Sequence, residues 1–447
     1  MDQTFMGTKK VFPLVLSMAL PMVLSMLVNS LYNIIDSYFV ARISADAMTS
    51  LSLIFPLQNI VGAVSIGFGV GVNAAVAFYI GAGDREKARE SASLGLILSI
   101  LHGIVLTIVM MIVMPGFLRS FGASEAIVEG GLNYGWIVMA FSVIISVGIC
   151  YEKLFQAVGL MKVSMFSMMA GCIANIILDP LMIFGLGPFP EMGIAGAAAA
   201  TGIGQLITLL IYLAVYLRGR LGIPISLNPF KRKWKLAGRL YLVGGPASLN
   251  QGLPSVLITV LNGILAGLGG NGVLILGIYN KLQTFIFLTV NGIVQGIRPL
   301  AGYNYGARKF GRVRQISRAA LSMALAIMVF GTLLCQLIPD RLMGLFLTDP
   351  AALSESARAL KIISLGFNAS AFSLTFSGML EGLGKGLHSL CIMLLRNVIV
   401  IIPAAFILTR LLGNADGVWH SFWIAEWVSV LIAGFLYRRV LARAEKK

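Results

Sequence analysis

The stretch LGLILSILHGIVLTIVMMIVM, residues 94–114, decides the fold class. It is an unbroken run of mostly apolar residues without Asp, Glu, Lys or Arg. A membrane-spanning helix needs about 20 such residues. The strands of a membrane β-barrel would instead alternate between apolar and polar residues over segments of about 10 residues. The run therefore predicts a transmembrane helix and excludes a barrel.

The composition of the whole chain agrees with this prediction. Of its 447 residues, 58% are hydrophobic and only 12% are charged, whereas soluble domains carry about 25% charged residues. The formal net charge is +16, but the basic residues lie in short loops between apolar runs. Lys and Arg in such loops set the orientation of a membrane protein. We therefore expect an integral membrane protein that binds no nucleic acid.

The apolar runs predict an all-α integral membrane fold with twelve transmembrane helices. The predicted spans are 11–39, 47–80, 91–115, 130–157, 163–187, 193–217, 238–267, 271–303, 317–345, 356–382, 387–411 and 415–440. Lys and Arg concentrate in alternate loops and at both ends of the chain. This pattern predicts that both termini are cytoplasmic, in a multi-pass protein of the cell inner membrane.

The longest loop divides the predicted spans into two sets of six. It covers residues 218–237, is basic and contains prolines, and we interpret it as a cytoplasmic linker. The predicted domains are an N-terminal lobe (1–217), the linker (218–237) and a C-terminal lobe (238–447).

The two lobes also repeat each other in sequence. The ungapped shift that superimposes Pro21 on Pro246, which we call the repeat shift, also superimposes Gln58 on Gln283, Gly67 on Gly292, Gly71 on Gly296, Gly81-Ala82 on Gly306-Ala307, and Gly159 on Gly384. Chance overlap of glycine-rich spans is the alternative. Because one shift aligns glycines and prolines from several spans, we favour two pseudo-symmetric six-helix bundles, an arrangement typical of transporters.

Most of the acidic residues lie near the ends of predicted spans, and three lie deeper, where a charge is costly and commonly serves ion or proton transport. The three are Asp36, Asp179 and Glu426. In VNSLYNIIDSYFV (28–40), Asn29 and Asn33 precede Asp36 at helical spacing, which predicts one polar stripe along a helix.

A second polar group lies in the fifth predicted span, in NIILDP. Asn175 and Asp179 are four residues apart, and Pro180 leaves a backbone carbonyl free in the preceding turn. Thr201 offers a hydroxyl in the next span. Carboxylate, amide and hydroxyl oxygens suit a hard cation, and a carboxylate in a low-dielectric site also carries protons. The alternative is that these side chains only hold helices together.

Other polar residues within spans are candidates for a substrate cavity. They are Gln58, Gln283, Lys281 and Glu426, together with Asn29 and Asn33. Lys281, in GIYNKLQTF, is a cation deep in a predicted span. Its side chain could contact a substrate or a carboxylate, or it could extend to the membrane surface. Glu426 is alternatively a group that stabilises its lobe through hydrogen bonds. No nucleotide-binding motif and no metal-ligand spacing is recognisable, so we expect no cofactor.

The sequence resembles the multidrug and toxic compound extrusion (MATE) transporters, in particular their MepA-like or DinF-like branch. The resemblance covers essentially the whole chain. It rests on NIIDSYFVARIS (33–44), YIGAGDREKA (79–88), ANIILDPLMIFGLG (174–187), AGAAAATGIGQ (195–205) and GYNYGARKFGRV (302–313).

This resemblance implies a transporter rather than an enzyme, which exports amphipathic, often cationic compounds in exchange for Na⁺ or H⁺ by alternating access. It also implies that Asp36, Asn175, Asp179 and Thr201 form the cation site, and that Na⁺, where it is the coupling ion, binds there. The seventh span lacks the acidic residue of NorM-like relatives, and Glu381 lies only at the end of the tenth. We therefore expect no second ion site in the C-terminal lobe.

Two alternative functions remain open from the sequence. A flippase for a lipid-linked saccharide would share the architecture but would need a more cationic cavity. A membrane enzyme would need a catalytic cluster at the membrane edge, for which YIGAGDREKARE (79–90) is the nearest candidate. For the favoured interpretation we expect small drugs or toxic organic cations as substrates, contact with membrane lipid, and a monomer.

Overall fold

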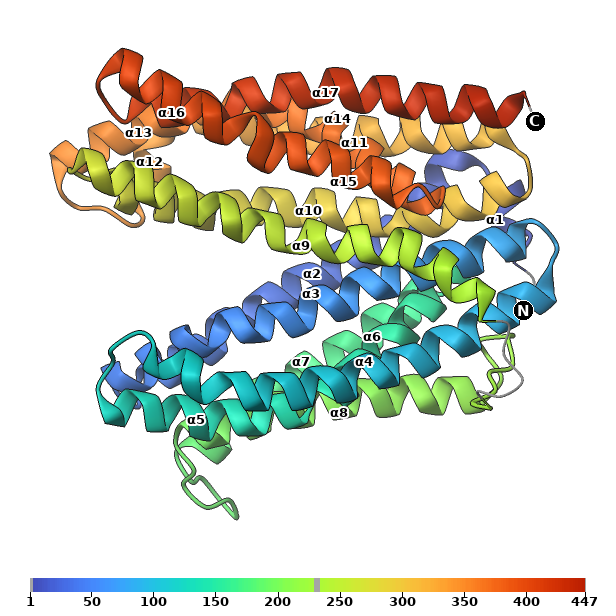
Figure 1. Ribbon diagram of the computed structural model, residues 1–447, viewed down its shortest axis with the longest axis horizontal. Coiled ribbons are helices and arrows are strands. Elements are labelled where there is room, and N and C mark those ends of the chain that lie inside the picture. The colour runs from blue at the N-terminus through green and yellow to red at the C-terminus, as the bar shows by residue number, and fades with distance from the viewer. Residues whose placement is uncertain (1–2, 229–233, 447) are drawn as a thin grey trace. The chain divides into compact units, whose positions relative to one another are not determined.

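The computed structural model describes residues 3–228 and 234–446, and every regular element in these ranges is helical. Residues 229–233 of the predicted linker lie outside the described residues. The helices of the N-terminal half (Figure 1) are α1 (Phe5–Thr8), α2 (Val11–Ala41), α3 (Ala45–Gly81), α4 (Arg85–Arg119), α5 (Glu125–Ala140), α6 (Ser142–Ala157), α7 (Met161–Ile183) and α8 (Ile194–Leu217). Those of the C-terminal half are α9 (Lys235–Leu268), α10 (Gly272–Gly306), α11 (Phe310–Leu337), α12 (Pro339–Gly344), α13 (Pro350–Ser364), α14 (Phe367–Gly382), α15 (Gly386–Leu394), the π-helix η2 (Leu395–Ile399), α16 (Ile401–Leu412) and α17 (Asp416–Glu445).

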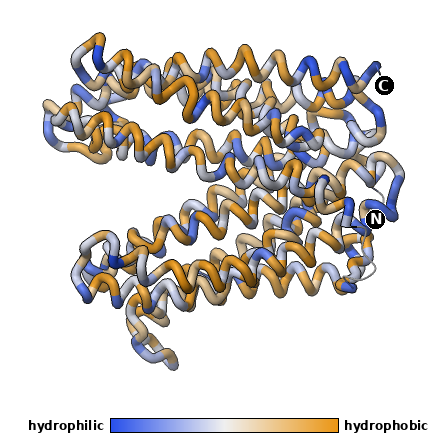
Figure 2. Tube along the Cα trace, viewed as in Figure 1, coloured by the Kyte–Doolittle hydropathy of each residue, from blue (hydrophilic) through white to orange (hydrophobic). Residues whose placement is uncertain are grey.

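These helices confirm the predicted all-α membrane fold. Among the described residues, nine helical segments are long and apolar enough to cross a membrane, and two bent helix pairs raise the number to eleven. The last predicted span, 415–440, coincides with α17, which has 30 residues. Figure 2 shows hydrophobic residues along most of the helices and hydrophilic residues gathered mainly at their ends. This is the distribution that a lipid bilayer requires.

The two bent helix pairs occupy equivalent places in the repeat. The α5–α6 pair bends by 45° at Phe141, and the α13–α14 pair bends by 48° around Gly366. The repeat shift places Phe141 on Gly366. Each break thus falls at the same point of its own half, as expected for duplicated six-helix bundles.

Contacts within the described chain define two compact units, which we call unit 1 and unit 2. Unit 1 contains residues 1–5 and 24–248, and unit 2 contains residues 6–23 and 249–447. Helix α2 therefore changes unit after Val23, and α9 changes unit after Ser248. The contact-defined units divide the chain inside α2 and α9, and not at residues 217 and 238, where the sequence predicts the lobe boundaries. The predicted lobes therefore stay a prediction.

Close packing of small residues holds α7 and α8 together in unit 1. A Cβ atom added to Gly171 would lie 2.5 Å from the backbone oxygen of Gly204, and one added to Gly204 would lie 2.8 Å from the oxygen of Gly171. Both distances are too short for real atoms, so each position requires glycine. The sequence AGAAAATGIGQ places small residues on α8, which lets the two backbones approach.

Candidate functional site

Asn175, Asp179 and Thr201 meet where α7 packs against α8. The amide Nδ2 of Asn175 donates a hydrogen bond to Oδ1 of Asp179 at 3.2 Å and another to Oγ1 of Thr201 at 3.3 Å. Asp179 is fully buried, Asn175 is 2% exposed, and Thr201 is partly buried. The structure therefore brings together three of the four residues of the predicted cation site.

Asp36, the fourth residue, comes from α2 and belongs to the same unit. Its side chain is buried, and its Oδ1 atom has no hydrogen-bond partner among the described residues. Oδ2 of Asp179 is likewise buried without a hydrogen bond in this part of the chain. The two carboxyl groups lie close enough for their charges to interact. Unsatisfied buried oxygens are costly, and here they provide acceptors for a cation or proton.

Two tyrosines that were not predicted from the sequence lie near enough to these carboxyl groups to interact with their charges. Tyr32, one turn before Asp36 on α2, interacts electrostatically with both Asp36 and Asp179. Tyr134 of α5 does the same, is 2% exposed, and accepts a hydrogen bond at 3.2 Å from Nε2 of Gln58. Gln58 is therefore linked to the site through Tyr134. Tyr32 could have been predicted, because it lies four residues before Asp36 on the same helix. Tyr134 lies on a different helix, and no local sequence pattern connects it with Asp36.

The predicted polar stripe on α2 reaches the site only in part. Asn29 is half-buried and contacts the thiol of Cys172 on α7. Asn33 is exposed, and its Nδ2 donates a hydrogen bond to the backbone oxygen of Asn29 at 2.7 Å. The structure therefore does not bring Asn33 into the group, because its amide instead bonds to its own helix.

A cavity of about 340 Å³ lies within unit 2, and its lining includes both apolar and polar side chains. Arg396 of η2 and Glu426 of α17 line it and form an ion pair, with 2.5 Å between Nε and Oε1. The hydroxyl of Ser373 donates to Oε2 of Glu426 at 3.3 Å. Gln283 of α10 also lines this cavity. Glu426 thus has a charged partner, Arg396, which was not predicted from the sequence.

Arg396 was overlooked as an intramembrane cation, although it lies near the middle of the predicted span 387–411. Its guanidinium also lies 5.4 Å from the centre of the Phe287 ring. The π-helix around it interrupts the regular helix, a feature often found at functional sites. Lys281, which the sequence analysis chose instead, has an exposed side chain and is not among the residues that line this cavity.

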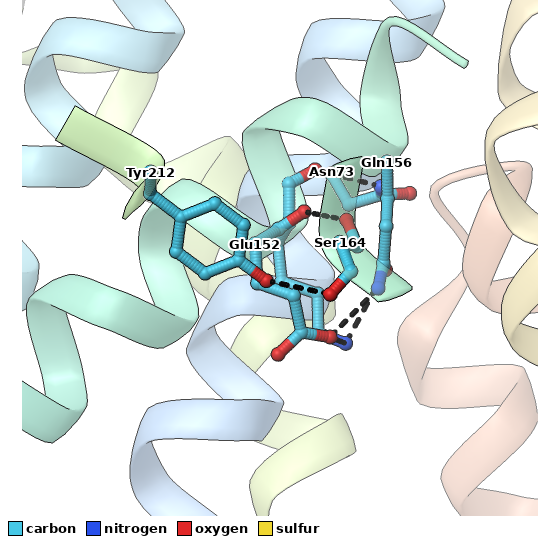
Figure 3. Close-up of polar contacts among 6 residues, drawn as sticks. Asn73, Glu152, Gln156, Ser164 and Tyr212 are labelled. Atoms are coloured by element: carbon cyan, nitrogen blue, oxygen red, sulfur yellow. Dashed lines mark hydrogen bonds and ion pairs between the residues drawn. The ribbon is translucent and has the colours of Figure 1, made fainter. Parts of the chain in front are cut away.

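A third polar cluster joins four helices of unit 1 (Figure 3). Tyr212 donates to the backbone oxygen of Ser164 at 3.3 Å, Gln156 donates to Glu152 at 2.7 Å, and Asn73 donates to the backbone oxygen of Lys153 at 2.9 Å. Glu152 and Lys153 also form an ion pair at 2.7 Å.

The repeat places a similar cluster in unit 2. There Arg298 pairs with Glu381 at 2.7 Å, and Glu381 accepts a hydrogen bond from Ser389 at 2.9 Å. The repeat shift relates Asn73 to Arg298, Gln156 to Glu381 and Ser164 to Ser389. Both clusters pair buried polar groups where helices meet, so we assign them to structural stability. The pairing is incomplete, because Oδ1 of Asn73 and Nε of Arg298 are buried without a hydrogen bond in the described chain.

The comparison with sequence families agrees with this arrangement. The MatE family pattern matches residues 21–181 and again residues 246–407. The chain belongs to the MATE family. The two matched segments begin at Pro21 and Pro246, the pair of positions that defines the repeat shift.

Individual MATE relatives are similar over nearly their whole length. The multidrug export protein MepA of Staphylococcus aureus (strain MRSA252) is 27% identical over 424 residues, covering 95% of this chain and 92% of MepA. MepA of Staphylococcus saprophyticus is 26% identical with the same coverage. These relatives are export proteins and not enzymes, so the enzyme alternative is set aside and this MATE protein is a multi-pass membrane transporter.

Solved MATE structures share the fold. A multidrug resistance MATE transporter of the MOP superfamily, in an outward-facing conformation, matches with a TM-score of 0.92 and 25% identity over 100% of this chain and 99% of its own. A MOP superfamily transporter from Pyrococcus furiosus, described as having a binding pocket of reverse polarity and a different function, matches with a TM-score of 0.91 and 26% identity over the same shares.

Proposed function

We propose that this MATE protein is a secondary active antiporter that exports amphipathic, cationic compounds in exchange for H⁺ or Na⁺. The interaction between Asp36 and Asp179, each with an unsatisfied buried oxygen in the described chain, carries the proposal. Asn175 and Thr201 complete the set of oxygen-bearing side chains. The set contains hard oxygen donors of the kind that Na⁺ prefers. Among the described residues, no group of three or more His, Cys, Asp or Glu is arranged to hold a metal ion.

The coupling follows from electrostatics. Two like charges in a low-dielectric site repel each other, so the empty site attracts a cation. When H⁺ or Na⁺ neutralises the carboxyl groups, the site loses its attraction for a cationic drug, and the drug leaves on the outer side. After the transporter turns inward and releases the ion, Asp36 and Asp179 are again available to the next cation. Coupled exchange requires that the affinity for the drug differ between the ion-bound and the ion-free state of the transporter.

Helix α2 is suited to transmit the change. Pro21 lies inside it and removes one backbone hydrogen bond. The helix passes from unit 2 to unit 1 shortly afterwards, after Val23. Asp36 lies on the part that belongs to unit 1. Neutralisation of Asp36 therefore acts on a helix that has a built-in point of bending.

Efflux from proteoliposomes tests the proposal. Purified protein would be reconstituted with a fluorescent organic cation inside, and a pH gradient and a sodium gradient would be imposed separately. We expect one of the two gradients, directed inward, to drive efflux, and a protonophore or a sodium ionophore to abolish it. Equal efflux without any ion gradient would contradict antiport.

The lipid-linked saccharide flippase receives less support from the cavity in unit 2. Such a substrate carries a pyrophosphate and needs excess positive charge. The charge of Arg396 in this cavity is balanced by Glu426. Adding lipid-linked saccharide to the same proteoliposomes would leave drug efflux unchanged if the antiporter proposal holds. We also propose a monomer in the cytoplasmic membrane with both termini on the cytoplasmic side.

A further inference from the structure

The repeat allows one loop of unit 1 to be compared with its counterpart in unit 2. Residues 81–90, GAGDREKARE, run from the end of α3 through the short loop into the first turns of α4, and they carry three acidic and three basic residues. Residues 306–315, GARKFGRVRQ, run in the same way from α10 into α11, and they carry four basic residues and no acidic one. The duplicated loop has therefore become strongly cationic in unit 2 only.

One of the basic residues found only in unit 2, Arg308, has a strained backbone conformation. Gly83 has φ of +77° in the loop of unit 1, and Arg308 occupies the equivalent position in unit 2 with φ of +56°. Arg308 is the only residue other than glycine with a positive φ in the described chain. A side chain in this left-handed region is strained, and such strain is often found at functional positions.

The same loop binds the N-terminal segment of unit 2. Nε of Arg312 donates to the side-chain oxygen of Asn304 at 3.2 Å, and its Nη2 donates to the backbone oxygen of Lys9 at 2.7 Å. Lys309 donates to the backbone oxygen of Gly7 at 3.0 Å. These contacts place the start of α2 beside the start of α11, so the basic residues of both segments lie together.

The result is a basic cavity of about 400 Å³ within unit 2. Four cationic side chains line it, with no acidic residue among the described lining: Lys9, Lys10, Arg312 and Arg318. Gln315 and Thr8 add polar groups. Phe12, which is 53% exposed, and Val11 lie on the first turn of α2 and also line the cavity. Exposed apolar residues continue along α2 at Leu16 and Leu20.

We propose that this basic cavity binds the phosphate headgroup of an anionic phospholipid. The cavity lies at the beginning of two spanning helices, where headgroups are found, and basic pockets in such places bind acidic lipids. The exposed apolar side chains of α2 continue from the cavity along the helix and would contact the acyl chain. A free phosphate would contact only the cationic side chains. The exposed apolar residues Phe12, Leu16 and Leu20, which we call the apolar track, therefore favour a lipid over a free phosphate.

Native mass spectrometry of the full-length protein in detergent would measure binding of phosphatidylglycerol, with phosphatidylcholine as the neutral control. The double variant Lys10→Gln/Arg318→Gln removes two charges that line the cavity. Each basic residue near anionic lipid contributes about fivefold in affinity, so phosphatidylglycerol binding should weaken about 30-fold. Binding of phosphatidylcholine should not change.

The repeat supplies a matched control. Arg85 and Arg89 line a cavity at the start of α4 in unit 1, and Glu86 lines the same cavity. Arg85→Gln/Arg89→Gln removes the same charge and should leave phosphatidylglycerol binding within about twofold of the original. Equal loss in both double variants would overturn the proposal, because it would show only a general attraction of charge.

A third variant separates binding from folding. Arg308→Gly relieves the strained backbone at a residue that does not line the cavity, so we expect the melting temperature to rise while phosphatidylglycerol binding stays within about twofold of the original. Unchanged lipid binding in the Lys10→Gln/Arg318→Gln variant would contradict the assignment. Competition by inorganic phosphate at the same concentration as phosphatidylglycerol would also contradict it, since the apolar track would then contribute nothing.

Discussion

The amide of Asn175 donates hydrogen bonds to both Asp179, one turn later on α7, and Thr201 on α8. One side chain thus fixes the position of a carboxyl group and a hydroxyl group on two helices. Oδ1 of Asn175 is also buried, and it has no hydrogen-bond partner in the described chain. It remains available to a cation.

Replacement of Asn175 by Ala should therefore weaken coupling-ion binding without unfolding the protein. It removes an acceptor and releases Asp179 and Thr201, each of which loses a hydrogen bond worth about 1 kcal/mol. We expect the ion concentration for half-maximal efflux to rise about 5- to 30-fold. Thr201→Ser keeps the hydroxyl and serves as the control. It should raise the ion concentration for half-maximal efflux less than Thr201→Val does.

The close contact of α7 and α8 should be sensitive to a single methyl group. In Gly171→Ala, the new Cβ atom would lie 2.5 Å from the backbone oxygen of Gly204, which cannot turn aside, so the helices must separate. We expect a loss of about 1–3 kcal/mol in stability and weaker ion coupling, measured by thermal unfolding and by efflux. At Gly148 a Cβ atom would meet only Leu209, at 4.0 Å, among the described residues. Gly148→Ala should be neutral or slightly stabilising.

Pro21 should matter for transport more than for stability. Pro21→Ala restores a backbone hydrogen bond in α2, so we expect a higher melting temperature together with slower efflux. Pro115 lies inside α4, which belongs wholly to unit 1. Pro115→Ala should also raise the melting temperature but should leave the efflux rate unchanged. Equal effects of both substitutions on efflux would refute a special role of α2.

The ion pair between Arg396 and Glu426 should be costly to break from one side. Both side chains are about nine-tenths buried, and removal of one partner strands a charge. We expect Arg396→Met or Glu426→Leu alone to cost about 3–5 kcal/mol. The double variant Arg396→Met/Glu426→Leu should recover most of this loss. Thermal unfolding in detergent would provide the comparison as a double-mutant cycle, and additive losses would show that the two residues do not interact.

The sequence predicted much of this architecture because membrane helices depend on long apolar runs, which are local features. Residues 94–114 indicated the fold class, and the repeat shift anticipated the two segments that match the MatE family. The intramembrane carboxylates Asp36 and Asp179 stood out because hydrocarbon excludes charge. Their shared role in ion binding stays a prediction, which their interaction in the structure supports.

Other features could not be predicted from local patterns. Tyr134 joins the site from a different helix, so only tertiary packing reveals it. Asn33 has the correct helical spacing but bonds to its own backbone instead, an option open to any Asn in a helix. Arg396 was visible in the sequence, but its partner Glu426 is 30 residues away, and the π-helix that carries it has no clear sequence signal.

Ion movement coupled to drug efflux tests the central claim most directly. Proteoliposomes containing the original protein, Asp36→Asn or Asp179→Asn would be loaded with drug, and entry of H⁺ or radioactive Na⁺ would be recorded as drug leaves. The account predicts ion entry coupled to drug efflux in the original protein and loss of that coupling in both variants. Undiminished coupled exchange in either variant would contradict it.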